Sequence, residues 1–366
     1  MKIAVDGYEL GREARGVGRV IDNILIPLFD LLPGAEFLIY TKESIGKYSH
    51  PRASEQVLPS PGGYLRWQNG PLRRALKKAK PDYFVATNYI LPLIAPWKSV
   101  LIEHDISAVS HPEWYPRRYT FTRRFLIKRS LEKAAFVVVP SEFIKSEIVV
   151  FFDLTPEKIK VLGWGIEEKF RRAPEESALA WKEKKGLKGK KVVGYLGFLN
   201  KRRHIPSLVQ AVGSLRKDFP EIILYIVGKD LSGSRSGEMA QALNQDWIKW
   251  EATLAEEELP LYYSSLDAFA FLSEYEGFGF PPLEALACGT PAVLLRRSSL
   301  QEIYSDVAFM VEKPDTEEVT EVLRTALTDK TECRHLLEMF EKKRSQFSWL
   351  RTAREFSLIL RDINST

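Results

Sequence analysis

Residues 273–291 have the sequence SEYEGFGFPPLEALACGTP and follow the apolar run at 269–272. Such a run is typical of the end of a buried strand, and Gly277 and Gly279 allow a sharp turn and a close approach to a ligand. The prolines that follow suit the first turn of a helix. The stretch therefore predicts a strand, a glycine loop and a helix whose start attracts an anion such as phosphate.

Short β-branched and aromatic runs alternate with amphipathic helical patterns along most of the chain, which indicates an α/β fold. The alternation starts again after residue 190, so we expect two doubly wound, Rossmann-like sheets with a boundary near residue 170. Ligands of such sheets bind at the carboxyl ends of the strands, so we expect function in a cleft between the domains. The expected strands are 2–5, 36–40, 83–86, 100–104, 136–140, 159–162, 192–196, 222–227, 248–250, 268–271, 292–295 and 309–311.

Two glutamates, Glu276 and Glu284, are separated by seven residues within EGFGFPPLEALACGTP. This pattern resembles the signature of the family 4 retaining glycosyltransferases, which have the two-domain GT-B fold. The resemblance implies that Glu276 contacts the hydroxyls of the donor sugar and that Glu284 holds the nucleotide ribose. It also implies that the loop at Phe278 and Gly279 meets the donor through backbone amides. The alternative is a tight turn followed by acids that the helix dipole favours.

A second match is GFLNKRRH at 197–204, which follows the expected strand at 192–196. It resembles the family's segment of a glycine, a spacer, an arginine and a lysine, with Gly197 as the glycine. The resemblance implies that Arg203 neutralises the departing diphosphate and that Arg202 assists in donor binding. Arginine at 203 replaces the usual lysine, and its planar fork should change the phosphate geometry. The alternative is an exposed basic helix start.

The first half of the chain contributes weaker candidates. Gly16 and Gly18, in the sequence GVGR, precede a helical pattern, and the resemblance implies that this turn closes over the donor phosphates. Its spacing does not match a dinucleotide fingerprint, and the alternative is a mobile surface loop. For His104, at the end of the strand at 100–104, the resemblance implies a place in the cleft near the donor sugar. A lone histidine there is otherwise more often a core group.

The resemblance covers nearly the whole chain and implies that a helix at 349–363 crosses back to the first domain. We therefore expect an acceptor-side domain of residues 1–170 with 348–366, and a donor-binding domain of residues 171–347. We expect no metal or other cofactor, because the five histidines are scattered and no Asp-x-Asp pair ends a strand. The cations of Arg202 and Arg203 would act where other transferases use magnesium.

Composition and charge exclude several classes of protein. The chain has 366 residues, only two cysteines, no signal-peptide core and no long apolar run, so we expect a cytoplasmic protein that does not span a membrane. Residues 1–170 hold 25 Lys and Arg against 19 Asp and Glu, a net +6, whereas residues 171–366 have a net −1. The basic segments at 72–78 and 117–129 indicate solvated helix faces or contact with anionic lipid or a phosphorylated acceptor. No nucleic-acid module is present.

These observations predict a retaining, metal-independent hexosyltransferase. It would move a sugar from a nucleotide-diphosphate donor, such as GDP-mannose or UDP-glucose, to a hydroxyl of a saccharide or lipid-linked acceptor in glycan biosynthesis. By the resemblance, the departing phosphate takes the acceptor's proton. Two alternatives stay open: another GT-B enzyme, such as a nucleotide-sugar epimerase or a phosphorylase, and a catalytically silent nucleotide-sugar binding subunit.

Overall fold

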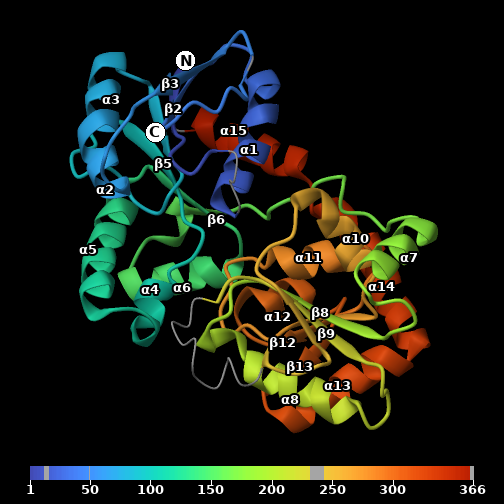
Figure 1. Ribbon diagram of the computed structural model, residues 1–366. Coiled ribbons are helices and arrows are strands. Elements are labelled where there is room, and N and C mark those ends of the chain that lie inside the picture. Colours follow the sequence, from blue (N-terminus) through green and yellow to red (C-terminus); the bar gives the residue numbers. More distant parts are fainter. Residues whose placement is uncertain (12–15, 49, 231–242, 363–366) are drawn as a thin grey trace. The chain divides into compact units, whose positions relative to one another are not determined.

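The computed structural model describes residues 1–11, 16–48, 50–230 and 243–362. The chain forms two compact units, the first of Met1–Gly165 with Gln346–Thr366 and the second of Ile166–Ser345. Each unit has one parallel sheet covered by helices (Figure 1). No helix in the described part of the chain combines the length and the apolar character that crossing a bilayer requires.

The first unit contains a seven-stranded sheet in the order β3-β2-β1-β4-β5-β6-β7. Its strands are β1 (Lys2–Asp6), β2 (Glu36–Thr41), β3 (Ala53–Val57), β4 (Tyr83–Ala86), β5 (Lys98–Ile102), β6 (Phe136–Val139) and β7 (Ile159–Val161). Its helices are α1 (Val17–Leu31), α2 (Tyr64–Trp67), α3 (Arg73–Ala79), α4 (Ser107–Ser110), α5 (Arg117–Lys133), α6 (Glu142–Phe152) and α15 (Trp349–Asp362). The strand order reverses between β1 and β4, and the carboxyl ends next to such a switch point are the usual place for a ligand.

The central strands of this sheet are apolar throughout because both faces are covered. In β1, Ile3, Ala4 and Val5 have no exposed surface, and Ile3 pairs with Phe37 of β2 on one side and with Tyr83 of β4 on the other. Polar residues appear where the strands end. The carboxyl ends of β1, β4 and β5 therefore bring polar side chains together above an apolar core.

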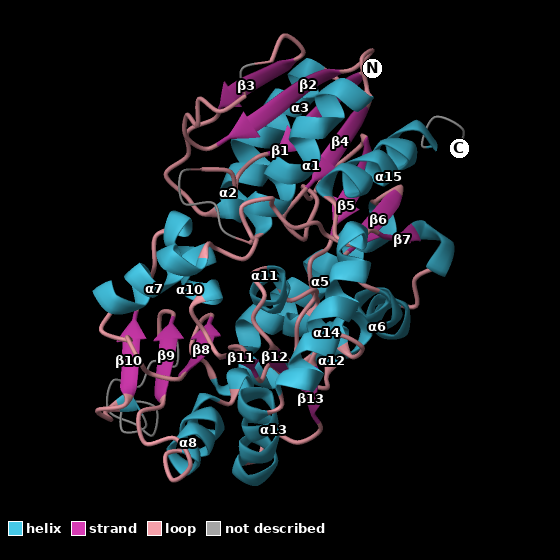
Figure 2. Ribbon diagram, turned by 90° about the vertical axis from the view of Figure 1, so that its right-hand side faces the viewer, coloured by secondary structure: helices cyan, strands magenta, loops and turns pink. Residues whose placement is uncertain are grey.

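The helix α15 follows the second unit in sequence but belongs to the first. It packs beside α1 (Figures 1 and 2). The ring of Trp349 lies 6.3 Å from that of Trp164, and Thr352 Oγ1 donates to the Gly163 carbonyl at 2.6 Å. Near its end, Arg361 donates to the Leu31 carbonyl at 3.0 Å. The first unit is thus built from both ends of the described chain.

The second unit contains a six-stranded sheet in the order β10-β9-β8-β11-β12-β13, with all strands parallel. Its strands are β8 (Val192–Leu196), β9 (Ile223–Val227), β10 (Ile248–Glu251), β11 (Ala268–Phe271), β12 (Ala292–Leu295) and β13 (Phe309–Val311). Its helices are α7 (Glu175–Lys184), α8 (Ile205–Leu215), α10 (Leu259–Ser264), α11 (Phe280–Ala287), α12 (Ser298–Tyr304), α13 (Thr316–Thr328) and α14 (Lys330–Lys343). The switch point lies between β8 and β11. The loop after β8 contains the basic motif at 197–204, and the loop after β11 contains the glutamate and glycine motif that begins at residue 273.

Three local expectations need correction. The edge strand β3 was not expected, because its sequence ASEQV lacks an apolar pattern. β5 ends at Ile102, two residues before the expected position, although the Glu103 amide still donates to the Val138 carbonyl of β6 at 2.8 Å. Gly18 is not in a turn before the helix: it is the second residue of α1 and is buried.

Candidate functional site

Two glycines shape the carboxyl ends of β8 and β9 in the second unit. Gly197 follows β8, and its amide donates to the Val227 carbonyl at 2.9 Å. A Cβ atom on Gly228 would lie only 1.8 Å from the Gly197 carbonyl oxygen. The two loops can therefore approach this closely only because residue 228 has no side chain.

Arg203 lies in the short 3₁₀ turn Lys201–Arg203 that follows the β8 loop. Its guanidinium forms an ion pair with Glu276, and Cζ lies 4.6 Å from the centroid of the Phe271 ring. Only 9% of the side chain is exposed, and Nε is buried with no hydrogen-bond partner among the described residues. Arg203 is thus a nearly buried cation with donor capacity that its protein neighbours do not fully use. Arg202, beside it, is half-buried.

Glu276, in the loop after β11, is positioned by three serines. Ser273 Oγ donates to Glu276 Oε1 at 2.6 Å, the Glu276 amide donates to Ser298 Oγ at 3.0 Å, and Ser299 Oγ donates to the Glu276 carbonyl at 2.8 Å. Ser298 adopts a left-handed φ of 49°, which is uncommon for a residue with a side chain. Hydrogen bonds at its amide and its carbonyl therefore hold the backbone of Glu276 in place. One oxygen of its carboxylate is engaged by Arg203 and Ser273.

Gly279 makes the turn from this loop into α11. Its φ of 88° lies in the left-handed region, and a Cβ would lie 2.7 Å from Leu300 Cδ2, so a side chain is excluded twice. Tyr304 Oη donates to the Gly279 carbonyl at 2.7 Å and fixes the turn. Phe278, the residue before Gly279, is 5% exposed. Its ring is therefore buried, and at this position the loop can offer a ligand its backbone but not the ring.

The start of α11 has fewer amide donors than a typical helix. Positions 281 and 282 are both proline and have no N–H, so the first turn loses two of the donors that would meet an anion. Within the part of the chain that the structure describes, the Gly279 amide donates to no protein atom. The start of α11 therefore offers an anion fewer amide donors than most helices do, although the helix dipole remains.

Glu284 lies on the buried face of α11. It is 3% exposed, and Tyr263 Oη donates to its Oε2 at 2.6 Å. Burial, followed by the charge of Glu284, raises the pKa of Tyr263 well above its usual range, so the phenol stays a donor. The predicted ribose-binding carboxylate is thus a buried group that a tyrosine holds in place.

Sequence reasoning missed a second ion pair in the same region. His204 Nε2 lies 2.6 Å from Glu274 Oε1, and Arg297 Nε lies 3.7 Å from Glu274 Oε2. The Glu274 amide also donates to the Arg202 carbonyl at 2.9 Å, which ties the β11 loop to the basic turn after β8. The sequence did contain a signal for this contact: His204 directly follows the basic segment, and Glu274 lies two residues before Glu276.

His104 follows β5 in the first unit. Its Nε2 lies 3.0 Å from the Thr87 carbonyl, and the imidazole packs near the rings of Tyr89 and Trp164 at 5.4 and 6.1 Å. Burial lowers its pKa, an effect that the Thr87 carbonyl and Asp105 oppose. With the ring neutral, Nε2 carries the proton and Nδ1 is left as an acceptor.

Two buried acids near His104 escaped the sequence analysis. Asp6, at the end of β1, accepts hydrogen bonds from Tyr64 Oη at 2.6 Å and from the Tyr8 amide at 3.1 Å, and burial raises its pKa to about 7. Glu103 is fully buried, and neither carboxyl oxygen has a hydrogen-bond partner among the described residues. Burial raises its pKa well above the usual range, although Arg123 opposes the effect.

The glycine turn before α1 is only partly described. Gly16 caps the helix with a left-handed φ of 63° and no side-chain cap, and Gly18 is in the first helical turn. Residues 12–15 lie outside the described residues. The predicted residues thus form one group in the second unit (Gly197, Arg202, Arg203, Glu276, Phe278, Gly279 and Glu284) and another in the first (Gly16, Gly18 and His104).

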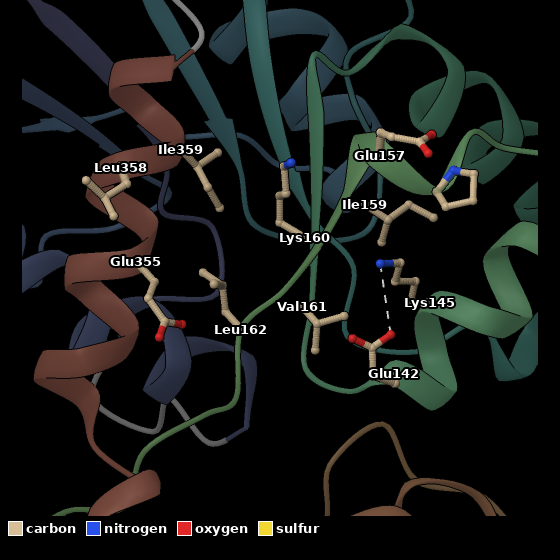
Figure 3. Close-up of a pocket in the computed structure, with 11 residues that line it drawn as sticks. Glu142, Lys145, Glu157, Ile159, Lys160, Val161, Leu162, Glu355, Leu358 and Ile359 are labelled. Atoms are coloured by element: carbon tan, nitrogen blue, oxygen red, sulfur yellow. Dashed lines mark ion pairs between the residues drawn. The ribbon is translucent and has the colours of Figure 1, made fainter.

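Two pockets of the first unit lie away from these residues. One of about 380 Å³ lies between α6, β7 and α15, where Lys145 and Glu142 form an ion pair at 4.0 Å (Figure 3). A second, of about 410 Å³, is lined by residues of α2 and α5. None of the predicted site residues lines either pocket. No cluster of three or more His, Cys, Asp or Glu among the described residues could hold a metal ion.

Comparison with known families accounts for both halves of the chain. Residues 178–344 match the model described as glycosyl transferases group 1, and residues 33–170 match the model described as glycosyltransferase family 4. The chain belongs to the group 1, family 4 glycosyltransferases. This hexosyltransferase therefore has the GT-B fold, which its two Rossmann-like sheets already show.

Relatives of this glycosyltransferase include the O-antigen chain mannosyltransferase B of Escherichia coli, which is 27% identical over 287 residues, or 75% of this chain and 73% of that protein. The serotype-specific mannosyltransferase WbdA of Escherichia coli is 25% identical over 267 residues, 70% of this chain, which spans about a third (32%) of that longer protein. Among solved structures, Anabaena HepE in complex with UDP-glucose superposes with a TM-score of 0.79 at 19% identity, covering 99% of this chain and 100% of that one.

Proposed function

We propose that this glycosyltransferase transfers a mannosyl group from a nucleotide-diphosphate mannose donor to a hydroxyl of a growing polysaccharide, with retention at the anomeric carbon. The observation that carries the proposal is the Arg203–Glu276 ion pair beside the Gly279 turn at the switch point of the second sheet. It combines a phosphate-binding cation with a carboxylate suited to sugar hydroxyls. Mannose is supported by the names of relatives from Escherichia coli, which are mannosyltransferases.

The diphosphate would be held by Arg203 and by the backbone around Gly279. Departure of the nucleoside diphosphate places negative charge on the oxygen that leaves C1 of the sugar, and preorganised donors stabilise that charge. Arg203 is suited to this task because it stacks on Phe271 in a nearly buried position and retains an unused Nε–H. Loss of two amides to proline at the start of α11 makes this side chain more important.

Glu276 would orient the sugar. Its Oε1 accepts from Ser273 and pairs with Arg203, so Oε2 is the oxygen suited to a donor-sugar hydroxyl. In the transfer, the bond from C1 to the phosphate oxygen breaks with its electron pair on phosphate, and a bond from C1 to the acceptor oxygen forms on the same face. The departing phosphate takes the acceptor's proton, so no side chain needs to act as general base. In the first unit, His104 Nδ1 would accept a hydrogen bond from a substrate hydroxyl.

The test measures nucleoside diphosphate released from GDP-mannose, UDP-glucose and other nucleotide sugars in the presence of mannan-type oligosaccharide acceptors. We expect release with GDP-mannose to exceed that with UDP-glucose, and we expect the NMR spectrum of the product to show the donor's anomeric configuration. Preference for UDP-glucose would overturn the assignment of mannose. Donor binding without release, with every acceptor, would favour the silent binding subunit over an enzyme.

Variants test the residue roles. Glu276→Gln should lower kcat by about 10²-fold or more while thermal melting stays near that of the parent protein, because the amide is isosteric but lacks the charge that holds Arg203. Glu312→Gln is the matched control: Glu312 is exposed and pairs with Arg296 and not with Arg203, so its turnover should be unchanged. Equal turnover of the two variants would remove Glu276 from the site.

A further inference from the structure

One face of α5 in the first unit has an unusual surface, which we call the α5 ridge. It consists of Phe121 and Phe125 with the cations Arg117, Arg118, Arg124 and Lys128. Residues four apart lie on one face of a helix, so Arg117, Phe121 and Phe125 follow one another along a single line. Arg124 and Lys128 lie on one side of this line and Arg118 lies on the other.

The two phenylalanines of the ridge face solvent. Phe121 is 80% exposed and Phe125 is 61% exposed, whereas the opposite face of α5 buries Leu126, Ile127 and Leu131 in the unit. Single exposed apolar residues are common, but two adjacent phenylalanines on one helical turn form a patch. The core of the unit does not use this patch, because α5 already has a complete buried face.

The charge around the patch is strongly positive. The sequence of α5 has seven Lys and Arg and one acidic residue, Glu132. Arg117, Arg118 and Arg124 form no ion pair with any described residue, and Lys128 Nζ lies 3.7 Å from Glu132. Phenylalanine side chains bordered by unneutralised cations match the interfacial zone of an anionic bilayer, where rings enter the headgroup region and cations meet lipid phosphates.

The start of α2 lies against another face of α5. The pocket of about 410 Å³ between the two elements is lined by residues of α5 outside the ridge and by the start of α2, where Leu65 is 44% exposed and Arg66 is also exposed. Figure 1 shows α2 and α5 along the same side of the first unit. The docking surface is therefore the α5 ridge itself.

We propose that the α5 ridge docks the first unit on an anionic lipid bilayer, with Phe121 and Phe125 inserted among the headgroups and the flanking cations on lipid phosphates. A second copy of the chain is a poorer occupant, because a symmetric contact would place two sets of arginines against each other. A protein partner is also a poorer match, because charged residues are depleted at the centre of protein interfaces. Single-stranded nucleic acid is bound in grooves that follow its backbone, whereas the ridge is a helix face.

The experiment is co-sedimentation of the full chain with vesicles of phosphatidylcholine alone or with added phosphatidylglycerol. We expect binding only to the anionic vesicles, and we expect it to weaken as salt is raised. The double variant Phe121→Ser/Phe125→Ser and the triple variant Arg117→Gln/Arg118→Gln/Arg124→Gln should each lower the partition coefficient by about tenfold or more. The positions are exposed, so circular dichroism and thermal melting should be unchanged.

Matched variants control for loss of any exposed apolar or charged group. Val150→Ser removes a side chain that is 79% exposed on α6, and Arg171→Gln/Arg334→Gln/Lys342→Gln removes three exposed cations of the second unit. Both controls should bind vesicles like the parent chain. Equal losses in controls and ridge variants, equal binding to neutral vesicles, tighter binding to single-stranded RNA, or a dimer in solution that the ridge variants dissociate would each overturn the proposal.

Discussion

Replacement of Asp6 by asparagine should remove much of the pH dependence of this protein's stability. Asp6 has no exposed surface, and burial raises its pKa from 3.8 to about 7 even though Tyr64 and the Tyr8 amide donate to it. The folded state therefore holds a proton on this carboxyl over a pH range in which the unfolded chain has lost it. Stability from Asp6 is fully present below the unfolded pKa and is lost as pH rises through the folded pKa.

The magnitude follows from the two pKa values. Their difference of about 3 units corresponds to about 4 kcal/mol at 1.36 kcal/mol per unit, and about 2 to 3 kcal/mol of this is lost between about pH 5 and pH 8. Asparagine is isosteric and uncharged, and its carbonyl oxygen can accept the Tyr64 hydroxyl. Asp6→Asn should therefore be about as stable as the parent near pH 5 and more stable near pH 8.

The assay is urea unfolding of both proteins across that pH range, followed by tryptophan fluorescence and circular dichroism to test whether the two units unfold together. Other buried acids, such as Glu103, change the stability of parent and variant alike, so the difference between the two proteins isolates Asp6. Parallel stability curves from pH 5 to pH 8 would refute the reasoning, because they would mean that Asp6 is already ionised in the folded state.

Three further predictions test other buried contacts. Gly228→Ala should lower the melting temperature and reduce the free energy of unfolding by about 3 kcal/mol or more, because the added methyl would lie 1.8 Å from the Gly197 carbonyl oxygen. A melting temperature equal to that of the parent would contradict this contact. Tyr263→Phe should cost about 1 to 3 kcal/mol in urea unfolding, since it leaves buried Glu284 without that donor, and a neutral result would mean that the carboxyl has another partner of equal worth. In the folded protein Cys333 should react with a thiol reagent far faster than Cys288, whose pKa burial raises to about 12; equal rates would show that Cys288 is accessible.

Periodicity predicted the strands that are buried on both faces and failed where a strand is exposed. The run 192–196 is apolar because β8 lies inside its sheet, and it was recognisable from sequence. By contrast, β3 is an edge strand whose sequence alternates little between apolar and polar residues, and its pairing with β2 comes from the backbone. Strand ends were also less predictable, since β5 stops at Ile102 although the residue after it, Glu103, still bonds to β6 through its amide.

The composition of the candidate site was more predictable from sequence than its contacts. Motif spacing identified Arg203 and Glu276, but no pattern could show that the two side chains form an ion pair. Nor could it show that Glu284 is buried against Tyr263, because that contact joins α11 to a helix 21 residues earlier in the chain. Donor roles for these residues stay predictions that the proposed assays address.

The return of α15 to the first unit affects how the protein is made. The ribosome completes residues 166–345 before it adds the helix whose Trp349, Phe356 and Leu360 are buried in the first unit. At about 5 to 20 residues per second, α1 waits on the order of ten seconds or more with its apolar flank open to water. A nascent chain that stalls in this interval would present that flank to chaperones and proteases, and a peptide with the sequence of α15 supplied in trans should protect it.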